Sequence, residues 1–163
     1  MVALFGFFKR HNTVDIFSPV NGTIVDLGNV PDPVFAQKMV GDGVAIEPTD
    51  GLIVSPVDGE VLQLFPTLHA IGLRSKEGLE TLIHIGIDTV ELKGDGFTAL
   101  IKQGDVVTVG TPLIKVDLDK LKSSGKSAVT PVILTNGEII QSIEKRYGDV
   151  EAGVDTIMVV AIK

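Results

Sequence analysis

The sequence predicts an all-β protein: an antiparallel β-sandwich or barrel with Greek-key-like hairpins and one or two short helical turns. Three observations favour this class. Short apolar runs alternate with turns, and the chain of 163 residues holds 18 glycines and 8 prolines. Val, Ile and Leu must form the core, because there is no tryptophan and only 1 tyrosine, and β-branched residues favour strands. Patterns typical of helices are few and short.

Two stretches of the chain resemble each other, SPVNGTIVDL at residues 18–27 and SPVDGEVLQL at residues 55–64. Each begins with Ser-Pro-Val, continues with Asn-Gly or Asp-Gly, and then places apolar residues at alternating positions. Asn-Gly and Asp-Gly are strong signals for tight hairpin turns. The pair therefore predicts two similar hairpin units packed in one β domain, and two copies are too few for a solenoid.

Other strands are expected where short apolar runs are bounded by Gly or Pro. They cover residues 43–46, 51–55, 69–74, 80–87, 106–109, 111–116, 129–134 and 156–162. Asp32 followed by Pro33 is typical of the start of a short helix, and Asp117 is expected to cap another that runs through Leu121. Residues 139–146 fit a strand or a helix.

Composition excludes several functions. The net charge is −7 and no run of Lys or Arg occurs, whereas nucleic-acid binding needs a basic surface. There is no cysteine, which excludes disulfides, thiolate nucleophiles and Cys-bound zinc and is compatible with a cytoplasmic location. No segment reaches the roughly 20 apolar residues that span a bilayer.

The chain divides into an N-terminal segment, residues 1–13, expected to be mobile, and one domain, residues 14–163. The segment's apolar residues precede its basic ones, the reverse of a signal peptide. They suggest at most a weak contact with a membrane surface through residues 1–10, chiefly Leu4, Phe5, Phe7 and Phe8. The Met1 start favours a freestanding protein.

Two histidines flank a predicted hairpin whose turn is Ser75-Lys76-Glu77-Gly78. With a two-residue loop, Ser75 faces Gly78 and His69 lies directly opposite His84, on one face of the sheet. A glycine bulge at Gly78 would shift this register by one residue.

The same register places Thr67 opposite Gly86, Phe65 opposite Asp88 and Ile71 opposite Leu82. The other face of the strand then carries Ile83, Ile85 and Ile87, which are expected in the core.

The paired histidines allow two kinds of chemistry. A neutral imidazole is a good nucleophile near neutral pH, and it can accept a phosphoryl group if a hydrogen bond holds its other nitrogen. The second histidine and Thr67 would then donate to the phosphoryl oxygens. Alternatively, two imidazoles supply two of the ligands of a zinc site, for which His11 is the only further histidine.

Four motifs resemble one family. They are LIHIGIDTVELKGDGF at 82–97, VPDPVFAQKMVGDGVAIEP at 30–48, SPVDGEV at 55–61 and Thr67-Leu68-His69-Ala70. Together they make residues 14–163 similar to glucose-type enzyme IIA of the bacterial phosphoenolpyruvate-dependent sugar phosphotransferase system. The resemblance implies a compact antiparallel β-sandwich that works in the cytoplasm without cofactor or metal.

The resemblance also implies an activity. Members of this family are phosphotransferase components with a phosphohistidine intermediate. They accept a phosphoryl group from the phosphocarrier protein HPr on a histidine and pass it to a cysteine of a sugar-specific IIB domain, for sugar uptake. Regulated permeases or kinases are implied as further partners.

The site residues follow by motif match. His84 resembles the phosphorylated histidine, through Nε2, His69 the second active-site histidine, and Thr67 its hydrogen-bonding neighbour. Asp32 and Asp88 match acidic positions beside the site. The apolar rim on which HPr and IIB dock is matched by Val34, Phe35, Met39, Val40, Phe65 and Leu82, and many members have phenylalanine in place of Leu82.

The alternative is a zinc metallopeptidase of LytM type. That group has a His-x-x-x-Asp ligand motif, which His84 and Asp88 fit. It also needs a later His-x-His pair, and no histidine follows His84. A swinging-arm carrier is disfavoured, because GDVVTVGTPL at 104–113 resembles the turn of biotinyl and lipoyl domains without their modified-lysine motif.

Overall fold

The computed structural model describes residues 12–163. The membrane contact expected through residues 1–10 lies outside the described residues, as does nearly all of the N-terminal segment. Within residues 12–163, every helix is too short or too polar to cross a bilayer.

Strands are the main regular structure of the described chain, and two short α-helices and three 3-10 turns connect some of them. The strands are β1 (Thr13–Phe17), β2 (Gly22–Val25), β3 (Asp42–Pro48), β4 (Leu52–Val54), β5 (Gly59–Leu64), β6 (Ala70–Ser75), β7 (Glu80–His84), β8 (Phe97–Ala99), β9 (Val106–Val107), β10 (Pro112–Val116), β11 (Thr130–Leu134), β12 (Ile140–Lys145), β13 (Gly148–Val150) and β14 (Thr156–Ile162). The helices and turns are η1 (Leu27–Asn29), α2 (Pro33–Ala36), η2 (Thr89–Leu92), α3 (Leu118–Ser123) and η3 (Gly137–Ile139).

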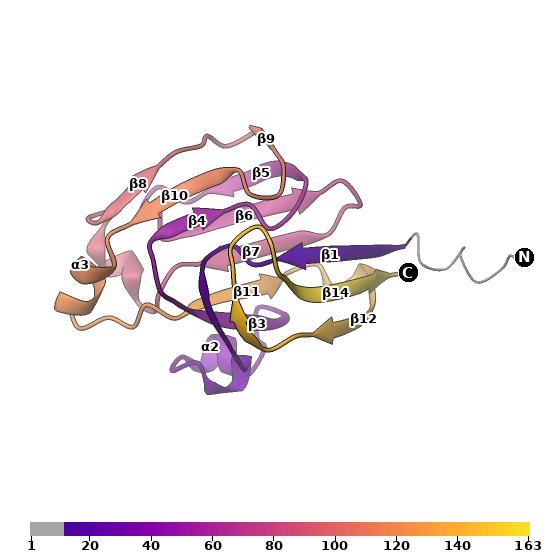
Figure 1. Cartoon of the computed structure of the whole chain (residues 1–163), viewed down its shortest axis with the longest axis horizontal. Coiled ribbons are helices and arrows are strands. Elements are labelled where there is room, and N and C mark those ends of the chain that lie inside the picture. The colour runs from indigo at the N-terminus through magenta and orange to yellow at the C-terminus, as the bar shows by residue number, and fades with distance from the viewer. Residues whose placement is uncertain (1–11) are drawn as a thin grey trace, which may run out of the picture.

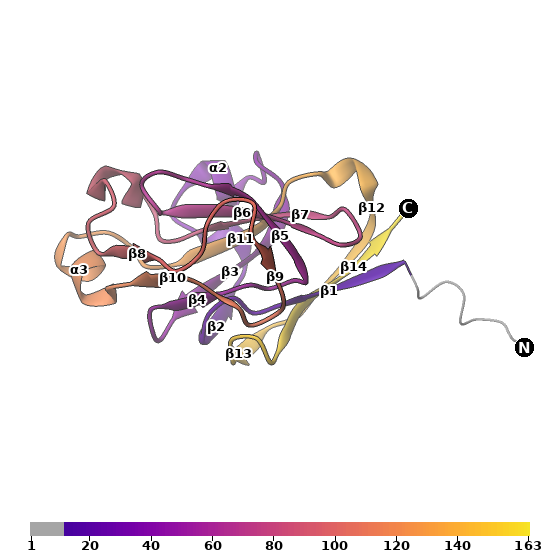
Figure 2. The same cartoon turned by 90° about the horizontal axis from the view of Figure 1, so that it is seen from above.

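The strands form one large sheet and two small ones. The large sheet has 8 strands in the order β13-β2-β3-β11-β7-β6-β5-β9, and the small sheets have the orders β1-β14-β12 and β4-β10-β8. Neighbouring strands are antiparallel throughout. Figures 1 and 2 show the small sheets stacked against one face of the large sheet. The all-β antiparallel sandwich that the sequence predicts is confirmed.

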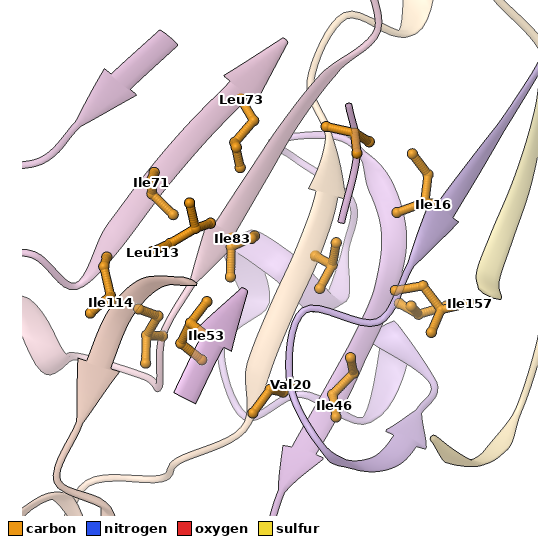
Figure 3. Packing of buried hydrophobic residues seen from close by; sticks show 14 of the residues in the cluster. Ile16, Val20, Ile46, Ile53, Ile71, Leu73, Ile83, Leu113, Ile114 and Ile157 are labelled. Atoms are coloured by element: carbon orange, nitrogen blue, oxygen red, sulfur yellow. The ribbon is translucent and has the colours of Figure 1, made fainter. Parts of the chain in front are cut away.

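The main core lies between the large sheet and the two small ones. It is built from aliphatic side chains: Ile71 and Ile83 of the large sheet lie beside Ile53 and Ile114 of the small β4-β10-β8 sheet (Figure 3). All four side chains are 2 % exposed or less. Burying this many aliphatic groups is the dominant stabilising contribution, about 1.5–3 kcal/mol for each fully buried side chain.

The repeated Ser-Pro-Val segments are not hairpins, so that expectation is wrong. Each carries the chain from a small sheet into the large one, from β1 to β2 and from β4 to β5. The two segments bind each other reciprocally: the amide of Phe17 donates to the carbonyl of Pro56 (3.0 Å), and that of Val54 donates to the carbonyl of Pro19 (2.7 Å). Because of these contacts between distant segments, the Asn-Gly and Asp-Gly turns form corners between two sheets and not hairpin turns.

The two corners share one local structure, so the expectation of two similar units is partly right. In each, a buried serine hydroxyl donates to the carbonyl two residues later: Ser18 to Val20 and Ser55 to Val57, both at 2.7 Å. The repeat in the sequence is therefore a repeat of corner geometry.

The β6–β7 hairpin pairs one residue away from the expected register. His84 pairs with Ala70, Ile83 with Ile71 and Leu82 with Gly72. The direct opposition of His69 to His84 is therefore wrong, and so are the pairs Thr67–Gly86, Phe65–Asp88 and Ile71–Leu82.

The turn explains the shift. The amide of Ser75 donates to the carbonyl of Leu79 (2.9 Å), which leaves a three-residue loop. Gly78 in that loop has a φ of +93°, a left-handed conformation that glycine adopts without steric cost. This conformation is the glycine bulge that the sequence allowed as the alternative to a two-residue loop.

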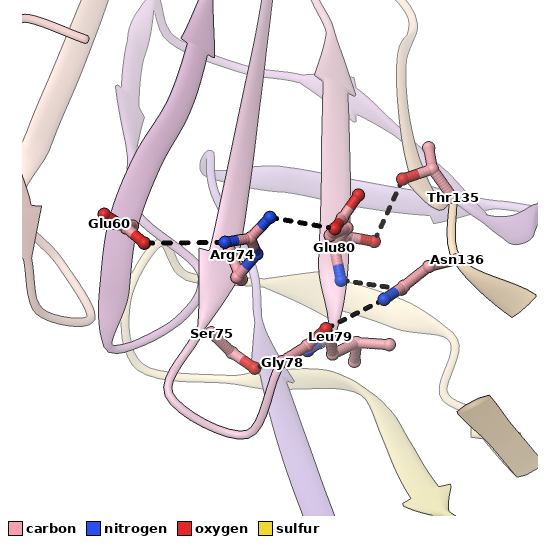
Figure 4. Close-up of polar contacts among 8 residues, drawn as sticks. All are labelled: Glu60, Arg74, Ser75, Gly78, Leu79, Glu80, Thr135 and Asn136. Carbon is pink, nitrogen blue, oxygen red and sulfur yellow. Dashed lines mark hydrogen bonds and ion pairs between the residues drawn. The ribbon is translucent and has the colours of Figure 1, made fainter. Parts of the chain in front are cut away.

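A distant side chain holds this turn in place (Figure 4). Asn136 accepts from the amide of Glu80 at Oδ1 and donates from Nδ2 to the carbonyl of Gly78, both at 2.8 Å. The hydroxyl of Ser75 accepts from the amide of Leu79 (3.1 Å). Two of these three bonds come from outside the hairpin, so its own sequence could not decide the register.

Most other expected elements are present with shifted ends. Asp32 caps α2 by accepting from the amide of Val34 (2.9 Å), and Asp117 caps α3 by accepting from that of Lys120 (3.1 Å). The ambiguous residues 139–146 form mainly a strand, β12. The strand expected over residues 80–87 ends at His84, because Gly86 turns the backbone into a left-handed conformation with a φ of +79°.

Candidate functional site

The two histidines meet on the outer face of the large sheet, away from the main core. His84 is the last residue of β7 and half-buried, and its neighbours Ile83 and Ile85 are buried on the opposite face. His69 precedes β6 and is 8 % exposed. The two ring centroids lie 5.1 Å apart, with the ring planes at 79°. The expected proximity of the imidazoles is confirmed, although the register that predicted it is wrong.

An irregular segment before β6 brings His69 to this face. Leu68 has a φ of +61°, which is rare for a branched apolar residue, and its amide donates to the carbonyl of Phe65 (2.8 Å). The carbonyl of His69 then accepts from the amide of Ile85 (2.7 Å). These bonds fix His69 beside the end of β7 although the two histidines are not a strand pair.

Each imidazole has a hydrogen-bond partner at its Nδ1 atom. The Nδ1 atom of His84 lies 2.7 Å from the carbonyl oxygen of Gly86. A carbonyl can only accept, so Nδ1 of His84 carries the proton and donates it. In a neutral imidazole the lone pair is then on Nε2, the atom that can act as nucleophile. The Nδ1 atom of His69 lies 2.5 Å from the hydroxyl oxygen of Thr67.

Aromatic rings flank the histidines. The Phe35 ring of α2 lies 4.9 Å from that of His84, and the Phe65 ring lies 5.6 Å from that of His69. Phe35 is 5 % exposed and belongs to a second, smaller apolar cluster that holds α2 against the outer face of the sheet. This cluster consists of Leu27, Val30, Phe35, Ala45, Ile87, Val129 and Ile133.

Burial and charge act on the histidines in opposite directions. Burial lowers the pKa of His84 below its ordinary value of 6.5, while the Gly86 hydrogen bond and the carboxylates of Asp32 and Asp88 partly offset that effect. Burial also lowers the pKa of His69, and the neighbouring His84 lowers it further. Both imidazoles are therefore neutral at pH 7, the state that a nucleophile requires.

The four aliphatic residues expected at the rim, which are those other than Phe35 and Phe65, fall into two groups. Val34 and Met39 are 40 % and 68 % exposed and lie on the segment that includes α2. Val40 and Leu82 are half-buried and pack against the second cluster, and Leu82 shares the outer face with His84. The first group lies at the surface, and the second packs against the cluster that holds α2.

The zinc interpretation gains no third ligand from the structure. Across residues 12–163, no three His, Cys, Asp or Glu side chains gather closely enough to hold a metal ion. His11, the remaining histidine, lies outside the described residues.

Several residues of the site did not stand out in the sequence. The carbonyl of Gly86 accepts the hydrogen bond from Nδ1 of His84, whereas the sequence placed Gly86 only as the residue opposite Thr67. The buried hydroxyl of Thr89 donates to the carbonyl of Ile85 (2.5 Å). The only available signal was a glycine two residues after the histidine.

Comparisons with known proteins point to one family. The family model described as "phosphoenolpyruvate-dependent sugar phosphotransferase system, EIIA 1" matches residues 14–140. The glucose-specific EIIA component of Halalkalibacterium halodurans is 48 % identical over 149 residues, which are 91 % of this chain and 86 % of that protein. That of Bacillus cereus is 47 % identical over 145 residues, 89 % of this chain and 88 % of that protein.

Two further relatives extend the comparison. The glucose-specific EIICBA component of Staphylococcus carnosus is 48 % identical over 139 residues, 82 % of this chain and 21 % of that protein. The solved structure of glucose permease IIA from Mycoplasma capricolum has a TM-score of 0.85 and 36 % identity, and the match covers 95 % of this chain and 99 % of that one. The LytM-type alternative finds no support here. The chain belongs to the EIIA 1 family of the phosphoenolpyruvate-dependent sugar phosphotransferase system and is a phosphoryl carrier of that system.

Proposed function

We propose that His84 is the residue that carries the phosphoryl group, bound at Nε2. The observation that carries this proposal is the hydrogen bond from Nδ1 of His84 to the carbonyl of Gly86. It fixes the tautomer, orients the ring and leaves Nε2 as the nucleophile. The donor is phospho-HPr and the acceptor is a cysteine of a sugar-specific IIB domain, in the cytoplasm.

The transfer exchanges one bond to phosphorus for another. The lone pair on Nε2 of His84 attacks the phosphorus of phospho-HPr, and the bond between phosphorus and the donor histidine breaks as its electron pair returns to that ring. The proton on Nδ1 stays with the Gly86 hydrogen bond throughout. In the second transfer a thiolate of IIB attacks and Nε2 regains its lone pair. Catalysis here consists of positioning and electrostatic stabilisation.

His69 stabilises the phosphoryl group in this proposal. Its ring is beside that of His84, and if the Thr67 hydroxyl donates to Nδ1, Nε2 of His69 carries the proton. That N–H can donate to a phosphoryl oxygen. Thr67 therefore acts through His69, by fixing its tautomer.

The apolar surroundings exclude water when a partner docks. Phe35 and Phe65 cover the two rings, and the exposed Val34 and Met39 extend the apolar surface outward. A dry interface protects phosphohistidine from hydrolysis. The names of the relatives suggest a glucose-specific IIB as the first acceptor to test, and regulated permeases or kinases stay a prediction.

Labelling tests the acceptor. We expect phosphoenolpyruvate, enzyme I and HPr together to add one acid-labile phosphate to the protein. His84→Ala should remove the label, whereas His69→Gln should still be labelled but pass the phosphate slowly to IIB. Full labelling of His84→Ala would refute the assignment, and fast onward transfer by His69→Gln would refute the role of His69.

A further inference from the structure

The loop that follows His84 has an unusual backbone that must be held in place. Gly86 and Asp88 have φ values of +79° and +60°, so two of its residues are left-handed, and Asp88 makes no side-chain cap to the turn η2 that it precedes. Such conformations persist only where the surroundings hold them. The position of the Gly86 carbonyl, and with it the tautomer of His84, therefore depends on what fixes this loop.

Thr89 packs against this loop from the buried side. Its side chain is fully buried, with 0 % exposure, and its hydroxyl donates to the carbonyl of Ile85 (2.5 Å). Its methyl group packs directly under Gly86, since a Cβ added to Gly86 would lie 2.6 Å from Cγ2 of Thr89. One side chain thus fixes the peptide before Gly86 and supports the α-carbon of Gly86.

Hydrogen bonds through Ile85 also connect Thr89 to the second histidine, His69. The amide of Ile85 donates to the carbonyl of His69 (2.7 Å), while the carbonyl of Ile85 accepts from Thr89. Ile85 therefore lies in a chain of hydrogen bonds that runs from Thr89 to the backbone of His69. The amide of Ile87 is held separately by the carbonyl of Ser127 (3.0 Å).

We propose that Thr89 is a positioning residue for phosphoryl transfer, which holds the loop 85–88 so that the Gly86 carbonyl meets Nδ1 of His84 and Nε2 stays unprotonated. Thr89 touches neither the phosphoryl group nor the partner. Its hydroxyl anchors Ile85, and its methyl group limits how far Gly86 can move. This inference rests on the proposed function of His84.

Two variants of Thr89 separate its hydroxyl from its methyl group. Thr89→Val removes the hydroxyl at nearly constant shape and leaves the carbonyl of Ile85 without its donor. Thr89→Ser keeps the hydroxyl and loses the methyl group. Thr81→Val is the matched control, because Thr81 lies on the same strand as His84 and, within the described residues, its buried hydroxyl has no hydrogen-bond partner.

The readouts are the His84 tautomer and the transfer kinetics. We expect long-range ¹H–¹⁵N spectra of Thr89→Val to show a larger share of His84 with its proton on Nε2. The kcat for phosphorylation by phospho-HPr should fall about tenfold or more, with KM little changed, since small misplacements of reacting groups are costly. Thr89→Ser should stay within about threefold of the wild type, and Thr81→Val should match it.

The outcomes separate this inference from the proposed function. A Thr89→Val protein with the wild-type tautomer and wild-type kcat overturns the inference, provided that His84→Ala is unlabelled. A labelled His84→Ala protein overturns the proposed function instead, whatever Thr89→Val does. If Thr89→Val does not fold, Thr89→Ala takes its place with the same expectations. A loss of stability with an unchanged tautomer and kcat would mean that the role of Thr89 is structural only.

Discussion

The rings of Phe35 and His84 lie 4.9 Å apart, tilted at 55° to each other. Phe35 comes from α2, a single helical turn that Asp32 caps, whereas His84 ends a strand of the large sheet. The contact thus joins the segment with the exposed Val34 and Met39 to the histidine itself. It also contributes to the burial that lowers the pKa of His84.

Removing the Phe35 ring should raise the pKa of His84. In Phe35→Ala the imidazole becomes more hydrated, so its pKa should move up toward 6.5, and the protein should lose about 3 kcal/mol of stability. NMR titration of the histidines and urea unfolding would measure both effects. Val34→Ala is the control, because its side chain is already 40 % exposed, and it should leave the titration unchanged. An unchanged His84 pKa in Phe35→Ala would contradict this account.

Stability should fall as the pH drops below 6.5. The pKa of both histidines is lowered in the folded protein, so the unfolded chain takes up these protons first and the free energy of unfolding decreases. Urea unfolding at about pH 7.5 and about pH 5.5 measures the slope. The double variant His69→Gln/His84→Gln should show a shallower dependence of stability on pH.

The phosphorylation rate should stay nearly flat down to about pH 6.5, since the nucleophile remains neutral. A decline that begins at higher pH would argue against a lowered pKa of His84.

Gly86→Ala should disable the site. The new Cβ would lie 2.6 Å from Cγ2 of Thr89 and 2.8 Å from the carbonyl oxygen of Ser127, in a backbone with a φ of +79°. We expect a loss of roughly 1–3 kcal/mol and slow phosphorylation, since the carbonyl that holds His84 must move. Gly72→Ala is the matched control for stability, because the nearest atom to its Cβ would be 3.9 Å away. Wild-type labelling of Gly86→Ala would show that this carbonyl is dispensable.

Asp88→Asn should favour the phosphorylated form. The carboxylate of Asp88 lies near enough to act on the charge of His84 and would repel a phosphoryl group there. Asparagine tolerates the left-handed backbone of this position. The equilibrium with phospho-HPr should shift toward phosphorylated protein by roughly two- to fivefold, as quantified by ³¹P NMR. Asp15→Asn, the same charge change on the exposed side of β1, should not shift it.

Thr81→Val should stabilise the protein. The hydroxyl of Thr81 is buried and, among residues 12–163, it has no hydrogen-bond partner, while valine has nearly the same shape. Removing an unsatisfied polar group should add about 1 kcal/mol to the free energy of unfolding. Thr130→Val is the comparison, because the buried hydroxyl of Thr130 donates to the carbonyl of Ala128 (3.0 Å) and its loss should destabilise. Equal effects of the two substitutions would contradict this reasoning.

The sequence predicts the features that depend on neighbouring residues. Alternation along residues 80–84 places His84 on the face opposite to Ile83, and that is what the structure shows. The caps at Asp32 and Asp117 are also local, and both are present.

Features that depend on distant contacts could not be predicted. Asn136 helps to fix the β6–β7 turn from 56 residues away, so the register was wrong by one residue. The Asn-Gly and Asp-Gly turns became corners because Phe17 binds Pro56 and Val54 binds Pro19. The histidines still meet, because the irregular backbone at Leu68 compensates for the shifted register.

The pairing of β1 with β14 has a consequence for how the fold can be connected. Thr13 pairs with Ala161 and the amide of Ile162 donates to the carbonyl of Asn12 (2.8 Å), so both ends of the described chain leave from one edge of the molecule (Figure 1). A tether attached to either end therefore starts from nearly the same point. A short linker could also join the ends and a surface loop be cut, which would give a circularly permuted protein with its strand order in space unchanged.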